Sequence, residues 1–194
     1  MNETYLQRRR KRKEQWFHIL LGMRQMAYKP LLNLLFLPII IGAVFLWLRR
    51  DLAFSFFSVP QLLFPIYKYA VLLTAILLFS IALLAVIEIV GILTARKDEA
   101  DVAEAFEFRE LRNGCPILMN KKRIKGSNVT MREFYSNIPM ETWVKRQEAI
   151  ADSMNVHFVE PLRYGGKANG RRIIMYTAPG RKTMGRGNLY DEEF

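Results

Sequence analysis

The chain has 194 residues, a net charge of +11, 51% hydrophobic residues, one cysteine and two histidines. One thiol cannot close a disulfide within the chain, and so few thiol and imidazole ligands cannot form a structural zinc site. The composition therefore argues against a disulfide scaffold and a metalloenzyme, and we expect neither a metal nor a cofactor. About half of the apolar residues gather between positions 31 and 95, a third of the chain, which indicates a small membrane protein.

Residues 1–30 contain a dense basic run, followed by an apolar stretch that starts at Trp16. The members of the run are consecutive: Arg8, Arg9, Arg10, Lys11, Arg12 and Lys13. A basic run beside an apolar stretch, just cytoplasmic of a membrane span, binds anionic lipid headgroups. We interpret residues 1–30 as a basic cytoplasmic or interfacial arm that faces lipid, with nucleic-acid contact as the alternative.

Two apolar blocks follow and predict a two-helix transmembrane hairpin over residues 31–95. The first, residues 31–48, contains no charge and covers the hydrocarbon core of a bilayer at about 1.5 Å per residue. The second, from about residue 66 to 95, contains only Lys68 and Glu88 as charged residues. An intramembrane carboxylate suggests function, but Glu88 lies near one end, where it can reach water or a basic partner. A small oligomeric transporter that uses Glu88 is the least favoured interpretation.

The distribution of Lys and Arg predicts the orientation of the hairpin. The loop between the spans has only Arg49, Arg50 and Lys68, whereas many more basic residues precede the first span and follow the second. Basic flanks stay in the cytoplasm. We therefore expect a multi-pass protein of the cell membrane with both termini in the cytoplasm.

After the second span the composition becomes polar. Residues 96–110 are predicted to be an acidic stalk, residues 111–182 an α+β module, and residues 183–194 a tail. Apolar runs between turn signals predict strands, and Pro139 opens a helix between them. The predicted elements are strands at 115–119 and 129–135, a helix at 139–154, and strands at 156–159 and 172–177. This order, strand-strand-helix-strand-strand, can close a small core with the helix across one face of the sheet.

Basic residues of the module concentrate in its two predicted hairpin turns and in the tail. If both turns lie at one end of the sheet, they form a basic face that can meet the phosphates of DNA or of anionic lipid. The predicted phosphate contacts are Lys121, Lys122, Arg123, Lys125, Lys167, Arg171, Arg172, Arg181 and Lys182. A solvated surface without a ligand is the alternative, because no aromatic residues interleave with these cations to stack on bases.

The module offers little for catalysis. Cys115 and His157 have no recognisable base or orienting group in the sequence, so we expect structural or surface roles for both. The run Gly165-Gly166-Lys167 does not match a phosphate-binding loop, which requires Ser or Thr after the lysine. We therefore expect no catalytic residues and no enzyme activity.

The architecture resembles the front part of FtsK/SpoIIIE-type DNA translocases, especially the membrane-anchored coupling proteins of conjugative elements. The resemblance is carried by the two-span hairpin, the stalk, and a sheet module that ends in NVHFVEPLRYGGKANGRRIIMYTAPGRK. In that family a module with a helix like IPMETWVKRQEAIADSMN precedes an ATPase motor. The resemblance covers residues 31–182, and the sequence ends at Phe194 before any motor. We expect a fragment, a decayed copy or a stand-alone partner of such a motor, and no catalytic residue of the family is carried over.

The resemblance implies a non-catalytic, membrane-anchored protein of DNA translocation or conjugation. Its module is expected to scaffold DNA, a P-loop motor or another DNA-transfer protein at the membrane, and we expect several copies to assemble. The alternative is a membrane-associated assembly or regulatory protein that binds anionic lipid and a protein partner and has no DNA role.

Overall fold

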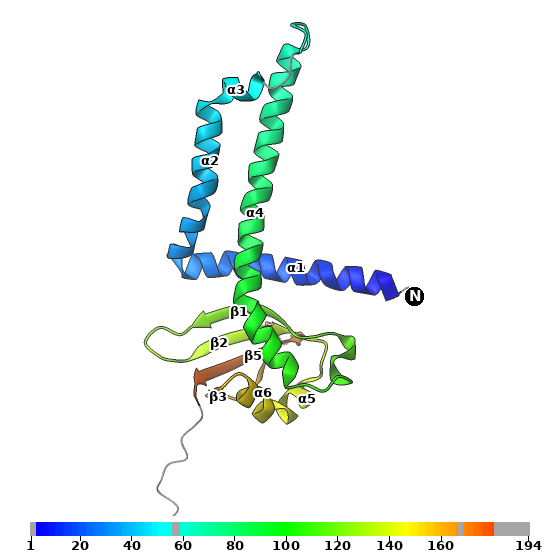
Figure 1. The fold of residues 1–194 in the computed structure, drawn as a ribbon. Helices are drawn as coiled ribbons and strands as arrows, with labels where there is room; N and C mark the ends of the chain where they lie inside the picture. Colours follow the sequence, from blue (N-terminus) through cyan, green and yellow to red (C-terminus); the bar gives the residue numbers. More distant parts are fainter. Residues whose placement is uncertain (1–2, 56–58, 167–168, 181–194) are drawn as a thin grey trace, which may run out of the picture. The chain divides into compact units, whose positions relative to one another are not determined.

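The computed structural model describes residues 3–55, 59–166 and 169–180 of the chain. The chain divides into two compact units, Met1–Thr94 and Ala95–Phe194. The first unit is helical, and the second contains a small sheet with short helices (Figure 1). Lys167, Arg181 and Lys182, three of the predicted phosphate contacts, lie outside the described residues, as does the predicted tail.

Prolines set the boundaries of the helices at the start of the chain. The elements are α1 (Glu3–Tyr28), the 3₁₀ helix η1 (Pro30–Phe36), α2 (Leu37–Leu48), α3 (Arg50–Phe54) and α4 (Phe64–Glu104). Pro30 has no N–H to donate, so it begins η1 and does not continue α1. Pro38 lies in the first turn of α2, where a backbone N–H has no partner within the helix in any case. The first apolar segment is therefore a 3₁₀ turn joined to an α-helix.

Two segments of the chain are long and apolar enough to cross a membrane, Pro30–Leu48 and the helix Phe64–Glu104. None of the residues in their most apolar windows is buried inside the protein. Helices of a soluble core bury such residues, whereas a bilayer leaves them exposed to lipid. The predicted pair of long apolar helices is thus confirmed.

Helices α1 and α4 contact each other through two glycines, and their crossing is visible in Figure 1. A Cβ atom added at Gly22 would overlap the carbonyl oxygen of Ile87, and one added at Gly91 would overlap that of His18. Backbones approach this closely only where both helices have small residues. Leu21, next to Gly22, is fully buried. The C-terminal part of α1 is therefore packed against protein.

The second unit contains an antiparallel sheet with strand order β1-β2-β5-β3, and β4 also pairs with β5. Its strands are β1 (Ile117–Arg123), β2 (Thr130–Tyr135), β3 (Val156–Phe158), β4 (Arg163–Gly165) and β5 (Asn169–Pro179). The sequence predicted four of these strands. β4 was missed because its three residues follow Pro161 in a segment with no alternating apolar pattern.

The core of the module forms around Trp143. This residue is fully buried, with its ring 5.0 Å from that of Phe106 and 5.8 Å from that of Phe134. Its indole N–H donates to Ser136 Oγ at 3.2 Å, so the one polar atom of the ring has a partner. Trp143 lies in α5 (Met140–Lys145), and α6 (Gln147–Ser153) follows directly. The sequence predicted one helix here, but the backbone breaks at Arg146, with φ −93° and ψ 6°.

The predicted stalk contributes to this core. α4 continues as a helix to Glu104, and the residues from Ala95 onward belong to the second unit. Val102 is fully buried and Asp98 is 4% exposed. The first part of the predicted acidic stalk is therefore the packed end of α4. A loop and the short 3₁₀ helix η2 (Glu110–Asn113) follow it.

Candidate phosphate-binding surface

A buried ion-pair cluster joins the end of α4 to the sheet. Asp98 Oδ2 lies 2.8 Å from Lys121 Nζ and 2.9 Å from Arg132 Nε. Arg132 also donates a hydrogen bond from Nη1 to Thr177 Oγ1. The side chain of Asp98 is 5% exposed, that of Arg132 11% and that of Lys121 30%. Helix α4 and strands β1, β2 and β5 each contribute one or more members.

Within this cluster two cations share one carboxylate oxygen. Charges in a buried position interact strongly and need compensation. Asp98 is thus the carboxylate that links the cation of β1 to the cation of β2. Lys121, a predicted phosphate contact, is thus already paired inside the module.

Sequence reasoning missed Asp98, Arg132 and Thr177. Arg132 alternates with Thr130 and Phe134 along β2, so the three share one face of the sheet. A charged residue two positions before the fully buried Phe134 was the signal that could have identified an internal ion pair.

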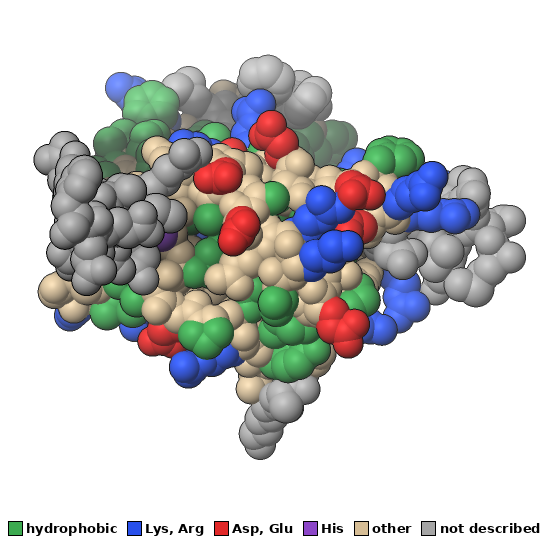
Figure 2. Space-filling view, turned by 90° about the horizontal axis from the view of Figure 1, so that it is seen from below, with side chains coloured by type: hydrophobic (Ala, Val, Ile, Leu, Met, Phe, Trp, Pro, Cys, Tyr) green, Lys and Arg blue, Asp and Glu red, His purple; other side chains and the backbone are tan. Residues whose placement is uncertain are grey.

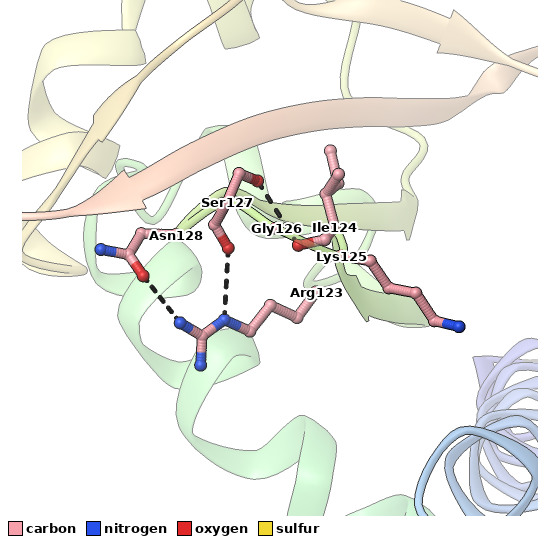
Figure 3. A pocket seen from close by; sticks show the side chains of 6 residues that line it. All are labelled: Arg123, Ile124, Lys125, Gly126, Ser127 and Asn128. Carbon is pink, nitrogen blue, oxygen red and sulfur yellow. Dashed lines mark hydrogen bonds between the residues drawn. The ribbon is translucent and has the colours of Figure 1, made fainter.

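The end of β1 and the β1–β2 turn carry the exposed cations Lys122, Arg123 and Lys125. Arg123 folds back over the turn, where Nη2 donates to Asn128 Oδ1 at 2.7 Å and Nε to the carbonyl oxygen of Ser127 at 3.4 Å (Figure 3). Gly126 has φ +78°, a conformation that favours glycine and lets the chain reverse. The turn encloses a shallow recess of about 480 Å³.

Two further predicted contacts, Arg171 and Arg172, lie at the start of β5. Arg172 Nη1 is 3.5 Å from Glu133 Oε1, and Arg171 Nη1 donates to the Tyr135 hydroxyl at 3.4 Å. Glu133 reduces the positive potential around Arg172, because an opposite charge at this distance offsets it.

The two basic turns do not form one face. Thr130, next to the β1–β2 turn, pairs with Thr177 near the end of β5, whereas Tyr135 pairs with Arg172 near its start. The β4–β5 turn precedes Asn169, so it lies at the opposite end of the sheet. The condition for a single basic face, that both turns lie at one end of the sheet, is therefore not met. Figure 2 likewise shows acidic side chains interspersed with Lys and Arg on the face it presents.

The remaining predicted residues lie in the first unit. The basic run is part of α1, where Arg8, Arg9, Arg10, Lys11 and Arg12 are exposed and Lys13 is half-buried. Glu88 is half-buried in α4, next to Ile87, whose carbonyl oxygen faces Gly22 of α1. The basic run and Glu88 belong to the first unit, whereas the sheet cluster belongs to the second.

Other reactive groups of the module have structural partners or open surroundings. His157 Nδ1 lies 2.8 Å from the carbonyl oxygen of Gly180, and Cys115 is exposed. The guanidinium of Arg146 donates to Glu107, and this hydrogen bond and the adjacent positive charge lower the pKa of the Glu107 carboxyl. Among the described residues, no group of three or more His, Cys, Asp or Glu side chains could hold a metal ion.

No protein-family model matches the chain, and no curated protein matches it. Among solved structures, the chain is similar to the pCW3 conjugation coupling protein TcpA, in its monomer form with ATPgS, with 28% sequence identity and a TM-score of 0.37. The match covers 43% of this chain and 24% of the coupling protein, so the chain spans about a quarter of that protein's length. A TM-score of this size does not establish a common fold.

Proposed function

We propose that this chain is a non-catalytic, membrane-anchored protein of the DNA translocation or conjugation type. Its module scaffolds DNA, or a motor partner that moves DNA, at the cytoplasmic face of the cell membrane. The observation that carries the proposal is that α4 runs without interruption from the second apolar segment into the module. This single helix of 41 residues includes the second apolar segment and also Asp98, which is ion-paired inside the module. The sequence resemblance to FtsK/SpoIIIE-type translocases supports the DNA role.

The proposal includes an orientation with both termini in the cytoplasm, and thiol labelling tests it. With the module in the cytoplasm, a membrane-impermeant maleimide should leave Cys115 unlabelled in intact cells. In inverted vesicles the reagent should label it, because Cys115 is exposed on the module. Gln61 is exposed between α3 and α4. A Gln61→Cys, Cys115→Ser variant should show the reverse pattern. Labelling of Cys115 from outside intact cells would overturn the orientation.

DNA binding is the second expectation of the proposal. The full chain in nanodiscs of neutral lipid should bind duplex DNA without sequence preference, and affinity should fall steeply with salt because bound cations release condensed counterions. Changing Lys122 and Lys125 together to Gln should weaken all sequences alike and flatten the salt slope by about one unit per lost phosphate contact. Lys145→Gln, an exposed lysine on α5, is the matched control. Failure of the folded protein to bind DNA at low salt would overturn the DNA role.

A second function is supported by the exposed part of the basic run on α1, Arg8 to Arg12. In this alternative the chain is a membrane-associated assembly or regulatory protein that uses these cations for anionic lipid. Detergent-purified protein should then retain anionic lipid over neutral lipid, and should lose this preference when the five residues are changed to Gln. DNA binding would be absent throughout.

A further inference from the structure

A recess of about 240 Å³ opens on the face of the sheet that also carries the core residue Phe134, at the end where the β1–β2 turn lies. Its polar lining comes from Arg123 and Asn128 of the turn, Thr130 and Arg132 of β2, and Thr177 of β5. Val156 of β3 and Pro179 of β5 complete it with apolar surface. The recess therefore crosses the whole width of the sheet, from β1 to β3.

The charge of this recess is positive and partly buried. The residues that line it include two arginines and no Asp or Glu, and one of the two, Arg132, is ion-paired with Asp98. Arg123 provides a cation at the rim, where it donates hydrogen bonds to the neutral groups of Ser127 and Asn128. An anion placed in the recess would meet the positive charge of Arg123 in surroundings of lower effective dielectric than water, where attraction is stronger.

We propose that this recess binds a phosphate of a nucleic-acid backbone. The inference rests on the proposed DNA-scaffolding function and names the surface that performs it. Arginine, threonine and asparagine side chains are the usual donors to DNA phosphates, and arginine adds charge-assisted hydrogen bonds. Val156 and Pro179 provide apolar contact for the sugar next to the phosphate. These contacts reach no base edge, so the binding is independent of sequence.

The donors are positioned before the ligand arrives. Thr130 and Arg132 lie on a paired strand, and the guanidinium of Arg123 is held by Asn128 Oδ1 at 2.7 Å. Preorganised donors lose little conformational entropy on binding. The site is also distinct from the exposed lysines of the turn, because Arg132 reaches it from inside the module.

Variants of two lining residues test the inference in the full chain in neutral-lipid nanodiscs. Arg123→Gln removes a cation from the exposed rim, and Thr130→Val removes a hydroxyl while keeping the side-chain shape. Arg123→Gln should weaken duplex DNA binding by about tenfold, and Thr130→Val by about threefold. The matched controls, Lys145→Gln and Thr142→Val on α5, should change the affinity by less than about twofold. Arg132 is left intact because its removal would take away a buried ion-pair partner of Asp98.

A second measurement uses inorganic phosphate as the probe. At equal ionic strength, phosphate in place of chloride should raise the melting temperature of the wild type more than that of Arg123→Gln. The general stabilising effect of phosphate on folded proteins acts on all variants alike. The control Lys145→Gln should therefore show the full wild-type shift.

The outcomes separate this inference from the proposed function. If DNA binds but Arg123→Gln and Thr130→Val behave like their controls, the recess is not the phosphate site, and the DNA-scaffolding function stands. If DNA does not bind while phosphate stabilises the wild type selectively, the recess takes an anion of another source, such as a lipid headgroup, and both the inference and the DNA role are overturned. Absence of both effects also overturns both.

Discussion

Replacing Asp98 with alanine is expected to destabilise the module by about 3–5 kcal/mol. The change removes the one carboxylate that Lys121 and Arg132 share, at 2.8 Å and 2.9 Å. Lys121 is 30% exposed and can turn toward water, but the side chain of Arg132 is 11% exposed and would remain as a buried, uncompensated cation. Hydrogen exchange of the β1 and β2 amides in the detergent-solubilised full chain measures the loss.

A matched surface pair provides the control for Asp98→Ala. Glu107 also accepts from a guanidinium, that of Arg146, but its side chain is 63% exposed. Water and salt screen such a pair, so Glu107→Ala should destabilise the module far less than Asp98→Ala. Changing Asp98 and Arg132 together to leucine and methionine should recover much of the lost stability, because no unpaired buried charge remains. A cost for Asp98→Ala as small as that for Glu107→Ala would show that the cluster is hydrated.

Adding a single methyl group at Gly91 is expected to separate α1 from α4. A Cβ atom there would overlap the carbonyl oxygen of His18, and backbone atoms of a helix cannot turn aside as a flexible side chain can. Overpacking of this kind costs typically about 1–3 kcal/mol. Gly22→Ala should act similarly, through the carbonyl of Ile87. Spin labels on the exposed residues Met23 and Leu93, in a Cys115→Ser background, should give a narrow distance distribution in the parent and a broad one in Gly91→Ala.

Gly42 provides the control in the same unit. A Cβ atom there would lie 3.9 Å from the ring of Phe79, which is an ordinary van der Waals contact. Because alanine forms helix better than glycine by up to about 1 kcal/mol, Gly42→Ala should be neutral or stabilising. An unchanged distance distribution in both Gly22→Ala and Gly91→Ala would contradict the close contact of the two helices.

The chain's linear pattern was enough to predict the two long apolar helices and four of the five strands. Uncharged runs such as residues 31–48 predict long apolar helices directly, and the strands alternate with turn residues such as Gly126. These signals are local, because helix and strand formation depend on residues close to one another in the chain. Short or broken elements were not predicted. β4 has only three residues, and the single helix predicted at 139–154 is broken at Arg146 into α5 and α6, each of which buries an apolar residue.

The candidate site depended on contacts between residues distant in sequence. Asp98 and Arg132 are 34 positions apart, and Arg132 and Thr177 are 45 apart, so their meeting depends on strand order and register. The same register placed the two basic turns at opposite ends of β5, which counting charges along the chain could not reveal. Charge composition is a property of the sequence. The position of each charge is set by which strands pair and in which register, because a shift of one residue would turn Arg132 to the other face of the sheet.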